Sequence, residues 1–440
     1  MSSEVRATLL GDLLEITSSK RIHMADYVTS GIPFYRSKEV IERAKGNSIS
    51  TELFISHEQF DLIKQKFGSP RDGDILLTSV GTLGVPYVVR GDGDFYFKDG
   101  NLTWMRNFSK EISPQFLYYW LTSPQIQQKL DEVSIGSTQK ALTISSLKAL
   151  QLPLPTRATQ DGIVEILGAI SDRITLLRET NATLEAIAQA LFKSWFVDFD
   201  PVRAKLEGRA PEGMDEATAR LFPDSFEESE LGLVPRGWRV GRVADLGDVI
   251  CGKTPPTAQT ENYGEDVPFI TIPDMHNLLV VTSTTRSLSR IGADTQRKKY
   301  LPPGSICISC IATPGLVVRV TAAAQTNQQI NSVVPLARWG KAFPLFLLRR
   351  IGVAVRAGGS GGSVFHNLSK SGFEELKVLL TTSELAQRFD EVIEPLVSKI
   401  VGNQIQAQTL ATLRDTLLPR LISGQLRLPE AQAAAEEALA

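Results

Sequence analysis

The sequence contains a long internal duplication, and this repeat limits the possible folds more than any other feature. Three stretches of the first half recur in the second half in the same order, at offsets that drift from 235 to 224 residues. The paired stretches are Ile32–Arg36 with Val267–Thr271, Pro70–Leu77 with Pro302–Ile308, and Ile135–Ser145 with Gly358–Ser369. A period of this length is that of whole domains, because the repeats of a solenoid are much shorter. The chain is therefore predicted to contain two related domains in tandem.

Length and composition are those of a water-soluble protein with more than one hydrophobic core. The chain has 440 residues, of which 42% are hydrophobic and 22% charged, and this is too long for one core. No apolar run approaches the roughly 20 residues that span a bilayer, and the first residues lack the pattern of an export signal. Three cysteines are too few for a disulfide framework. We therefore expect a cytoplasmic protein.

The net charge of −2 is unusual for a protein that binds DNA, but its distribution is uneven. Residues 198–230 contain ten acidic and four basic side chains, and the tail from Glu430 onward adds three further negative charges. The remainder of the chain therefore carries a net charge of +7. This mild excess permits contact with phosphate groups without demonstrating it.

Each repeated half has the pattern of an α+β domain of about 150 residues. Short β-rich runs bounded by Gly and Pro occur at Asp74–Thr78, Tyr87–Arg90 and Ser305–Ile311, as expected of strands. We expect a helix after Ser113-Pro114 and its counterpart after Phe343-Pro344, because proline is favoured at the first position of a helix.

A long helical segment with a seven-residue period follows each domain. Spacings of four and three residues alternate along the first seam and, after a shift of 226 residues, along the second, which is typical of a coiled coil. The first seam comprises Ile163, Leu167, Ile170, Ile174, Leu177, Asn181, Leu184, Ala188 and Leu191. The second comprises Phe389, Ile393, Leu396, Ile400, Asn403, Ala407, Leu410, Arg414 and Leu417. We expect Pro395 to start a new helix or to kink the old one, and Pro419 to end it.

The two helices are predicted to pack against each other in antiparallel orientation. Two equal tandem units are related by a pseudo-dyad only if their long helices run in opposite directions. Placing Asn181 opposite Asn403 also pairs Ile174 with Leu410 and Leu184 with Ile400, and facing asparagines can hydrogen-bond and fix a register. In the alternative arrangement, each apolar stripe packs onto its own domain.

Motifs for phosphate binding and metal binding occur without the structural context that they need. Gly247–Thr254 fits a phosphate-binding loop, but Pro255-Pro256 follows at once and the preceding Val243–Val249 has a helical pattern, whereas the motif needs a strand before it and a helix after it. Cys307 and Cys310 lie in a predicted strand and point to opposite faces. The histidines His23, His57, His276 and His366 have no metal-ligand spacing. Motifs for methyl transfer or DNA cleavage are not evident, so we expect no catalysis, no cofactor and no metal in this chain.

The ordered set of motifs resembles the specificity subunit of Type I restriction–modification systems over residues 1 to about 430. The resemblance rests on Gly73–Leu77, Gly136-Ser137 with Leu142–Ile144, Leu191–Pro201, Gly232–Trp238 and Leu418–Leu426. It implies two target recognition domains, each reading one half of an asymmetric bipartite DNA site, and paired helices that set the unread gap. It also implies two adenine methyltransferase subunits docked on the helices, together with motor-nuclease restriction subunits that supply the remaining activity.

This interpretation divides the chain into segments and points to candidate contacts with DNA. The predicted segments are recognition domain 1 (1–157), spacer helix 1 (158–197), an acidic linker (198–234), recognition domain 2 (235–382), spacer helix 2 (383–423) and a tail (424–440). The candidate contacts are polar and basic side chains in predicted loops, suited to phosphates, guanine or adenine. They are Lys20, Arg21, Arg36, Lys38, Gln139, Lys140, Lys253, Arg286, Arg290, Arg297, Lys298 and Lys299.

Two other classes of function remain open at this stage. A stand-alone restriction or methylation enzyme would need a catalytic motif that we do not find. A scaffold whose two globular heads bind peptides would share the architecture, but its DNA binding would lack the salt dependence of phosphate contacts.

Overall fold

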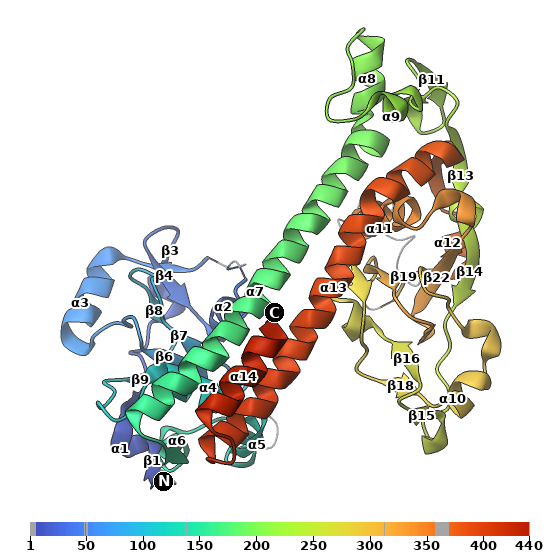
Figure 1. Ribbon diagram of the computed structural model, residues 1–440. Coiled ribbons are helices and arrows are strands. Elements are labelled where there is room, and N and C mark those ends of the chain that lie inside the picture. Colours follow the sequence, from blue (N-terminus) through green and yellow to red (C-terminus); the bar gives the residue numbers. More distant parts are fainter. Residues whose placement is uncertain are drawn as a thin grey trace. The chain divides into compact units, whose positions relative to one another are not determined.

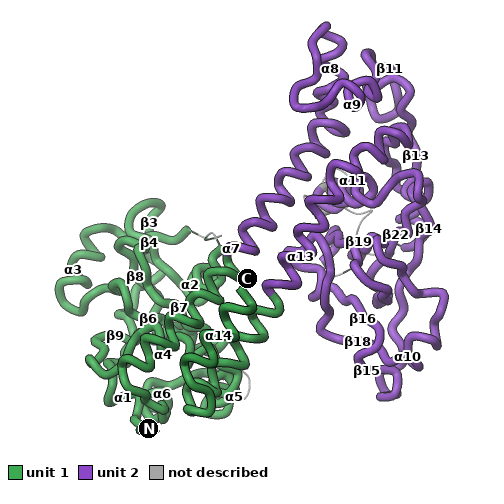
Figure 2. Tube along the Cα trace, in the orientation of Figure 1, with its two compact units in different colours: residues 1–175, 408–440 green, residues 176–407 purple. Residues whose placement is uncertain are grey.

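The computed structural model describes residues 6–47, 49, 52–136, 140–311, 313–356 and 369–439. The chain divides into two compact units, which are residues 1–175 with 408–440, and residues 176–407 (Figure 2). Within the described residues, no helix is long and apolar enough to cross a membrane.

The first domain contains one antiparallel sheet, one mixed sheet and a strand pair. One sheet has the order β2 (Glu15–Thr17), β9 (Leu102–Arg106), β6 (Ile75–Thr78) and β7 (Pro86–Val88). The other has the order β3 (Tyr27–Val28), β5 (Phe54–Ile55), β4 (Ile32–Tyr35) and β8 (Tyr96–Phe97), while β1 (Arg6–Leu9) pairs with β10 (Gln151–Leu154). Every residue of β6 is buried, so the apolar run that identified this strand forms the centre of the domain.

The second domain repeats this arrangement, with one additional strand, β17, at the edge of its first sheet. Its first sheet has the order β14 (Gly247–Cys251), β22 (Ile330–Pro335), β19 (Ile306–Ser309), β20 (Val317–Val320) and β17 (Val280–Val281). Its second sheet has the order β15 (Tyr263–Gly264), β18 (Ser287–Leu288), β16 (Val267–Ile270) and β21 (Gln325–Thr326), and β13 (Arg239–Arg242) pairs with β23 (Lys377–Leu380). Gly73 and Gly304 precede the central strands with φ of +90° and +92°, a conformation that favours glycine. The predicted duplication and the α+β class are confirmed.

Helices flank the strands of both domains. In the first domain they are α1 (Leu10–Leu13), α2 (Ser37–Ala44), α3 (His57–Phe67), α4 (Pro114–Thr122), α5 (Pro124–Glu132) and α6 (Ile144–Lys148). In the second they are α10 (Arg290–Asp294), α11 (Ala342–Arg356) and α12 (Lys370–Glu374), with short 3-10 turns at 243–245, 260–262, 272–275, 297–299 and 337–339.

The predicted start was right for one helix and two residues late for its counterpart. α4 begins at Pro114, as expected, with the Ser113 hydroxyl accepting a hydrogen bond from the Phe116 amide. α11 begins at Ala342 instead of Pro344. The reason is Asp390, whose carboxylate accepts hydrogen bonds from the Lys341 and Ala342 amides, both 2.6 Å long, and so caps an earlier turn.

The two long helices are α7 (Arg157–Lys193), which ends in a π-helical turn at Ser194–Asp198, and α13 (Ser383–Ile422) (Figure 1). Pro395 does not start a new helix, because α13 continues through it. Pro395 is exposed, so the carbonyl that loses its amide donor faces solvent. Pro419 does not end the helix either, since α13 continues to Ile422, and Gly424, with φ of +74°, lies just beyond it.

The acidic segment and the tail are both folded. Residues 198–234 contain α8 (Asp200–Leu206), α9 (Glu216–Arg220) and the strand β11 (Phe226–Ser229), which pairs with β12 (Gly232–Pro235). Val202 and Phe222 from this segment are buried in the core of the second unit. The tail forms α14 (Leu428–Leu439), which buries Ala431 and Ala435.

Candidate nucleic-acid interface

The first domain gathers several predicted contact residues at one sheet edge. β4 and β8 run parallel, with Tyr35 opposite Phe97, so the residues that follow them, including Arg36 and Asp99, meet at the same edge. Arg21 forms an ion pair with Asp99 at 2.9 Å. Burial raises the pKa of Tyr27, with Arg36 opposing this shift and Asp99 adding to it, which places all three groups near one another. Arg21 and Arg36 therefore lie together at this edge.

The loop that carries Lys20 contacts strand β8 at the same edge. The Lys20 amide donates a hydrogen bond of 2.8 Å to the Tyr96 hydroxyl, and its ammonium group lies 4.6 Å from the centre of the Phe67 ring. Lys20 is exposed. Its ammonium group therefore lies over an apolar ring at the surface, where it can reach a phosphate.

Other predicted contacts in this domain have different surroundings. Arg36 forms an ion pair with Glu39 at 2.7 Å. Burial raises the pKa of Glu39, but hydrogen bonds from Arg36 outweigh it and leave that pKa lowered, so Arg36 also stabilises the start of α2. Lys38 is exposed on α2. Lys140 pairs with Asp131 at 2.6 Å beside the end of β6, and Gln139 lies outside the described residues.

In the second domain, a buried amide brings distant cations together. Gln296 is 7% exposed, and its side chain donates to the Lys253 carbonyl at 2.8 Å and to the Gln325 amide oxygen at 2.7 Å. This links the loop after β14 to the 3-10 turn that follows Gln296 and carries Arg297, Lys298 and Lys299. Lys253 and this basic turn therefore form one cationic surface, which Asp294 partly offsets through its ion pair with Arg297.

The Arg286 guanidinium stacks on an aromatic ring. It lies 4.7 Å from the centre of the Tyr263 ring, at the edge of a cleft of about 420 Å³ lined by Tyr263–Glu265 and Thr284–Ser287. Within the described part of the chain, no acceptor forms a hydrogen bond with this guanidinium. An arginine stacked on an aromatic ring keeps its planar donors oriented. The nearby Arg290 is exposed on α10, and its amide donates to Asp266 at 2.8 Å.

The helical seam contains the predicted asparagine pair. The Asn403 side-chain amide donates to the Asn181 side-chain oxygen at 2.9 Å, and the Asn181 amide donates to the Ile400 carbonyl at 3.2 Å. The ring centres of Phe192 and Phe389 lie 5.8 Å apart. Together with the asparagine pair, this contact shows that residue numbers increase along α7 in the direction in which they decrease along α13. The predicted antiparallel direction and the Asn181–Asn403 register are confirmed in the second unit. Buried seam residues are Ile170, Ile174, Leu177, Ile400, Asn403, Leu410 and Leu417, while Leu184, Leu191 and Leu396 are partly buried.

The segment with the phosphate-loop pattern, Gly247–Thr254, has neither the structure that the motif requires nor the helix that we predicted before it. The expected helix at Val243–Val249 is wrong, because a 3-10 turn at Val243–Asp245 is followed by strand β14, which pairs along its length with β22. Strand pairing therefore overrides the local helical pattern. No helix opens at Lys253-Thr254, and the Lys253 amide is already bonded to the Thr326 carbonyl at 2.9 Å. These residues lack the helix N-terminus that holds phosphate.

Cys307 lies in β19, whereas Cys310, which we expected in the same strand, directly follows it, and the two side chains pack on different sides. Cys307 packs in one hydrophobic cluster with Val318, and Cys310 packs in another with Val317. Burial raises the pKa of the Cys307 thiol to about 12, so this thiol stays protonated near neutral pH. Within the described residues, no cluster of three or more His, Cys, Asp or Glu side chains could hold a metal ion.

This burial predicts unequal reactivity of the three thiols. Treatment of the folded chain with iodoacetamide at pH 8 should modify Cys251, which is partly exposed, at least about tenfold faster than Cys307, because only an accessible thiolate reacts. Peptide mass spectrometry gives both rates, and full reaction of all three thiols in urea is the control. Equal rates in the folded chain would contradict the buried position of Cys307.

A family model decides what kind of protein has this architecture. The model of the Type I restriction modification DNA specificity domain matches the chain twice, at residues 3–186 and 235–406. The chain belongs to the Type I restriction–modification specificity family. The matched segments contain both sheet pairs and parts of both long helices, so the duplicated unit of this family is the one seen in the fold.

Relatives of known name cover most of the chain. It is 36% identical over 409 residues to the HindI specificity subunit of Haemophilus influenzae, covering 83% of this chain and 89% of the relative. It is 26% identical to the MjaIX specificity subunit of Methanocaldococcus jannaschii, covering 81% and 78%. A crystal structure of the S subunit from M. genitalium has the same fold, with a TM-score of 0.55 at 15% identity, covering 94% of this chain and 95% of that one.

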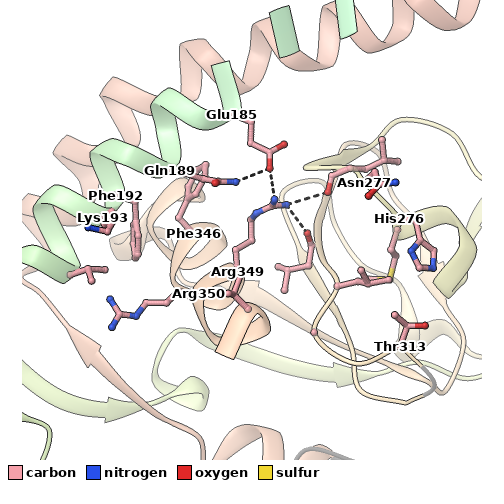
Figure 3. A pocket seen from close by; sticks show the side chains of 17 residues that line it. Glu185, Gln189, Phe192, Lys193, His276, Asn277, Thr313, Phe346, Arg349 and Arg350 are labelled. Carbon is pink, nitrogen blue, oxygen red and sulfur yellow. Dashed lines mark hydrogen bonds and ion pairs between the residues drawn. The ribbon is translucent and has the colours of Figure 1, made fainter. Parts of the chain in front are cut away.

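Sequence reasoning missed the contacts that hold the second specificity domain against the helices. The ion pairs Arg319–Glu394 and Arg349–Glu185 are examples. Arg349 and Glu185 line a cavity of about 920 Å³ between α7 and α11 (Figure 3). A signal was present for one of them, because Arg319 interrupts the apolar run Val317–Val320 of a buried strand. A charged side chain in such a strand needs a partner.

Proposed function

We propose that this chain is the non-catalytic, sequence-specific DNA-binding subunit of a Type I restriction–modification complex. Residues 1–157 and 235–382 each read one half of a bipartite asymmetric site, and the helices within 158–197 and 383–423 set the unread gap. Two adenine methyltransferase subunits dock on the helices, and restriction subunits with endonuclease and ATPase activity complete the complex. Cofactors then belong to those subunits.

One observation carries this proposal: the same pair of sheets, each with basic residues at its edge, occurs twice on two antiparallel helices. A seam of about 25 residues spans roughly 38 Å, close to one turn of B-DNA at about 34–36 Å. Two reading domains at such a separation meet the same face of a duplex. The excess of positive charge outside the acidic segment supports contact with phosphate.

Apolar side chains on the outer surfaces of the helices support the docking of partner subunits. Leu176 and Ile187 on α7 are 52% and 45% exposed, and Ile405 on α13 is 53% exposed. Apolar residues that a coiled coil leaves outside its seam are candidates for a protein interface.

A methylation map tests the proposal directly. The chain is co-expressed with an adenine methyltransferase partner in a host without its own adenine methylation, and long-read sequencing locates N6-methyladenine across the genome. We expect one bipartite motif with a fixed gap, and no methylation when either protein is expressed alone. DNA binding by the purified complex should weaken steeply as salt increases. Binding without salt dependence, and no motif, would favour a peptide-binding scaffold.

Arg286→Ala is expected to relax one position of the second half-site. A bidentate contact from arginine to guanine contributes about 1–3 kcal/mol of discrimination, which is roughly a 5- to 150-fold preference. In the methylation map, the variant should therefore accept other bases where the wild-type chain requires guanine, while the first half-site is unchanged. Arg220→Ala, at an exposed arginine in the acidic segment, is the control and should keep the wild-type motif. An unchanged motif for Arg286→Ala would exclude this contact.

A further inference from the structure

Two arginines of the second domain form ion pairs with the long helices, one with each helix. Arg319, on strand β20, pairs with Glu394 of α13, and its side chain is 8% exposed. Arg349, on α11, pairs with Glu185 of α7, and both side chains are less than one quarter exposed. All four residues lie within the second unit.

The Arg349 side chain is held from several directions. It donates hydrogen bonds of 3.2 Å to the Leu278 and Val317 carbonyls, in addition to its pair with Glu185. Gln189, one turn further along α7, donates to the same carboxylate at 2.8 Å. Figure 3 shows the Arg349 guanidinium between the helix and the loops of the domain. One side chain therefore joins α7, α11, the first residue of strand β20 and the loop before β17.

The equivalent positions in the first domain are neutral. Arg319 pairs with Ile306 in the sheet as Val88 pairs with Ile75, so Val88 takes the place of Arg319. Arg349 stands five residues after Pro344, and Tyr119 stands five after Pro114. The Tyr119 hydroxyl lies 3.5 Å from that of Ser171 on α7. The helix shift of 226 residues places Gly168 and Ala411 where the second unit has Glu394 and Glu185.

The two domains share the same sheets, but only the second forms these ion pairs with the helices. The first domain forms the same sheets without these charges, so the fold itself does not need them. Partly buried ion pairs add little net stability, because the desolvation of both charges offsets their attraction. A hydrogen-bonded ion pair does require a particular geometry of its two partners, whereas contact between apolar surfaces is non-directional. Charged contacts here therefore serve to hold the domain in one orientation.

We propose that the ion pairs Arg319–Glu394 and Arg349–Glu185 fix the orientation of the second recognition domain on the helices and thereby select the gap between the two half-sites. The proposal rests on the function proposed above. One extra base pair moves a half-site by about 3.4 Å and rotates it by roughly 35°. A domain held only by apolar contacts can follow such a shift, whereas a domain held by directional contacts on two helices cannot.

The test uses the co-expressed complex and the methylation map. Glu185→Gln and Glu394→Gln are combined, because each removes one charge without removing the side chain from its helix. Methylation is compared at the wild-type gap and at the same half-sites separated by one base pair more or less. We expect the preference for the wild-type gap to fall by about tenfold, which corresponds to roughly 1.4 kcal/mol. Glu179→Gln, at an exposed glutamate of α7, is the matched control and should keep the wild-type preference.

The outcomes are distinguishable. A single fixed gap in the double variant, equal to that of the wild type, overturns the proposal. An equal loss of methylation at every gap, with the preference retained, also overturns it, because that result indicates a structural or binding role alone. If the wild-type complex shows no bipartite motif, the proposed function fails before the ion pairs are tested. Restoration of the gap preference when Glu185 and Glu394 are returned one at a time would assign the effect to one or both pairs.

Discussion

Phe389→Ala is expected to destabilise the second unit by about 3–5 kcal/mol, the range found when a buried phenylalanine is truncated. Phe389 lies on α13 and is fully buried. Its ring centre is 5.0 Å from that of Phe196, 5.6 Å from that of Trp195 and 5.8 Å from that of Phe192. The ring therefore joins the end of α7 to the start of α13, and alanine would leave a cavity among aromatic side chains that cannot move closer together.

Urea unfolding monitored by tryptophan fluorescence measures this effect, since Trp195 is in direct contact with the altered residue. Phe389→Leu is the control, because it retains most of the buried apolar volume, and it should cost less than about half as much as alanine. Far-ultraviolet circular dichroism before unfolding establishes that both variants are folded. Equal unfolding midpoints for the alanine variant and the wild type would show that this cluster does not hold the two helices together.

The duplicated architecture could be predicted because its signals are periodic or repeated. The run Ile75–Thr78 and its counterpart Ile306–Ser309 are both central buried strands, and each follows a turn with glycine at positive φ. The seam of α7 and α13 was visible as an alternation of three and four residues, and the asparagine pair identified one register among many. These features depend on local sequence and on symmetry.

Features that depend on contacts between distant residues were not predictable in this way. Asp390 caps α11 from another helix and moves its start to Ala342. Strand pairing with β22 converts the helical pattern before Cys251 into β14. Pro395 was expected to start a new helix or to kink the old one, yet α13 continues through this exposed position without a new start. In each case the local sequence allows more than one secondary structure, and a contact with a distant residue or exposure to solvent determines which one forms.

For the candidate interface, too, the sequence predicted some features, whereas others depend on contacts between distant residues. Arg286 and Lys253 were selected because they are basic and lie in predicted loops. The sequence did not show that Tyr263 stacks with Arg286. It also did not show that Gln296 joins Lys253 to the turn at 297–299. Arg36 was selected for the same reasons, and much of its hydrogen bonding goes to Glu39. Exposure and pairing, which follow from the fold, therefore separate base-reading candidates from cations that stabilise the domain.

Asn181→Leu and Asn403→Leu are expected to destabilise the chain singly and to stabilise it together. Asn403 is 2% exposed, and Asn181→Leu removes the acceptor for its side-chain amide, which leaves a buried donor unsatisfied at a cost of about 1–3 kcal/mol. Asn403→Leu should cost less, because the partly buried Asn181 keeps its hydrogen bond to the Ile400 carbonyl. In the double variant, two leucines replace a polar pair in an apolar seam, and the melting temperature should exceed that of the wild type.

Differential scanning calorimetry of all four chains measures the coupling between the two positions. Gln408→Leu, at an exposed position further along α13, is the control for added apolar surface and should leave the melting temperature nearly unchanged. A double variant that melts below the Asn181→Leu chain would mean that the hydrogen bond contributes more than the seam gains from leucine. A stabilised double variant would instead show that the asparagine pair selects the register of the two helices without adding to their stability. An all-apolar seam accepts neighbouring registers more readily, so this chain should be more stable and, in the methylation map, less strict about the gap.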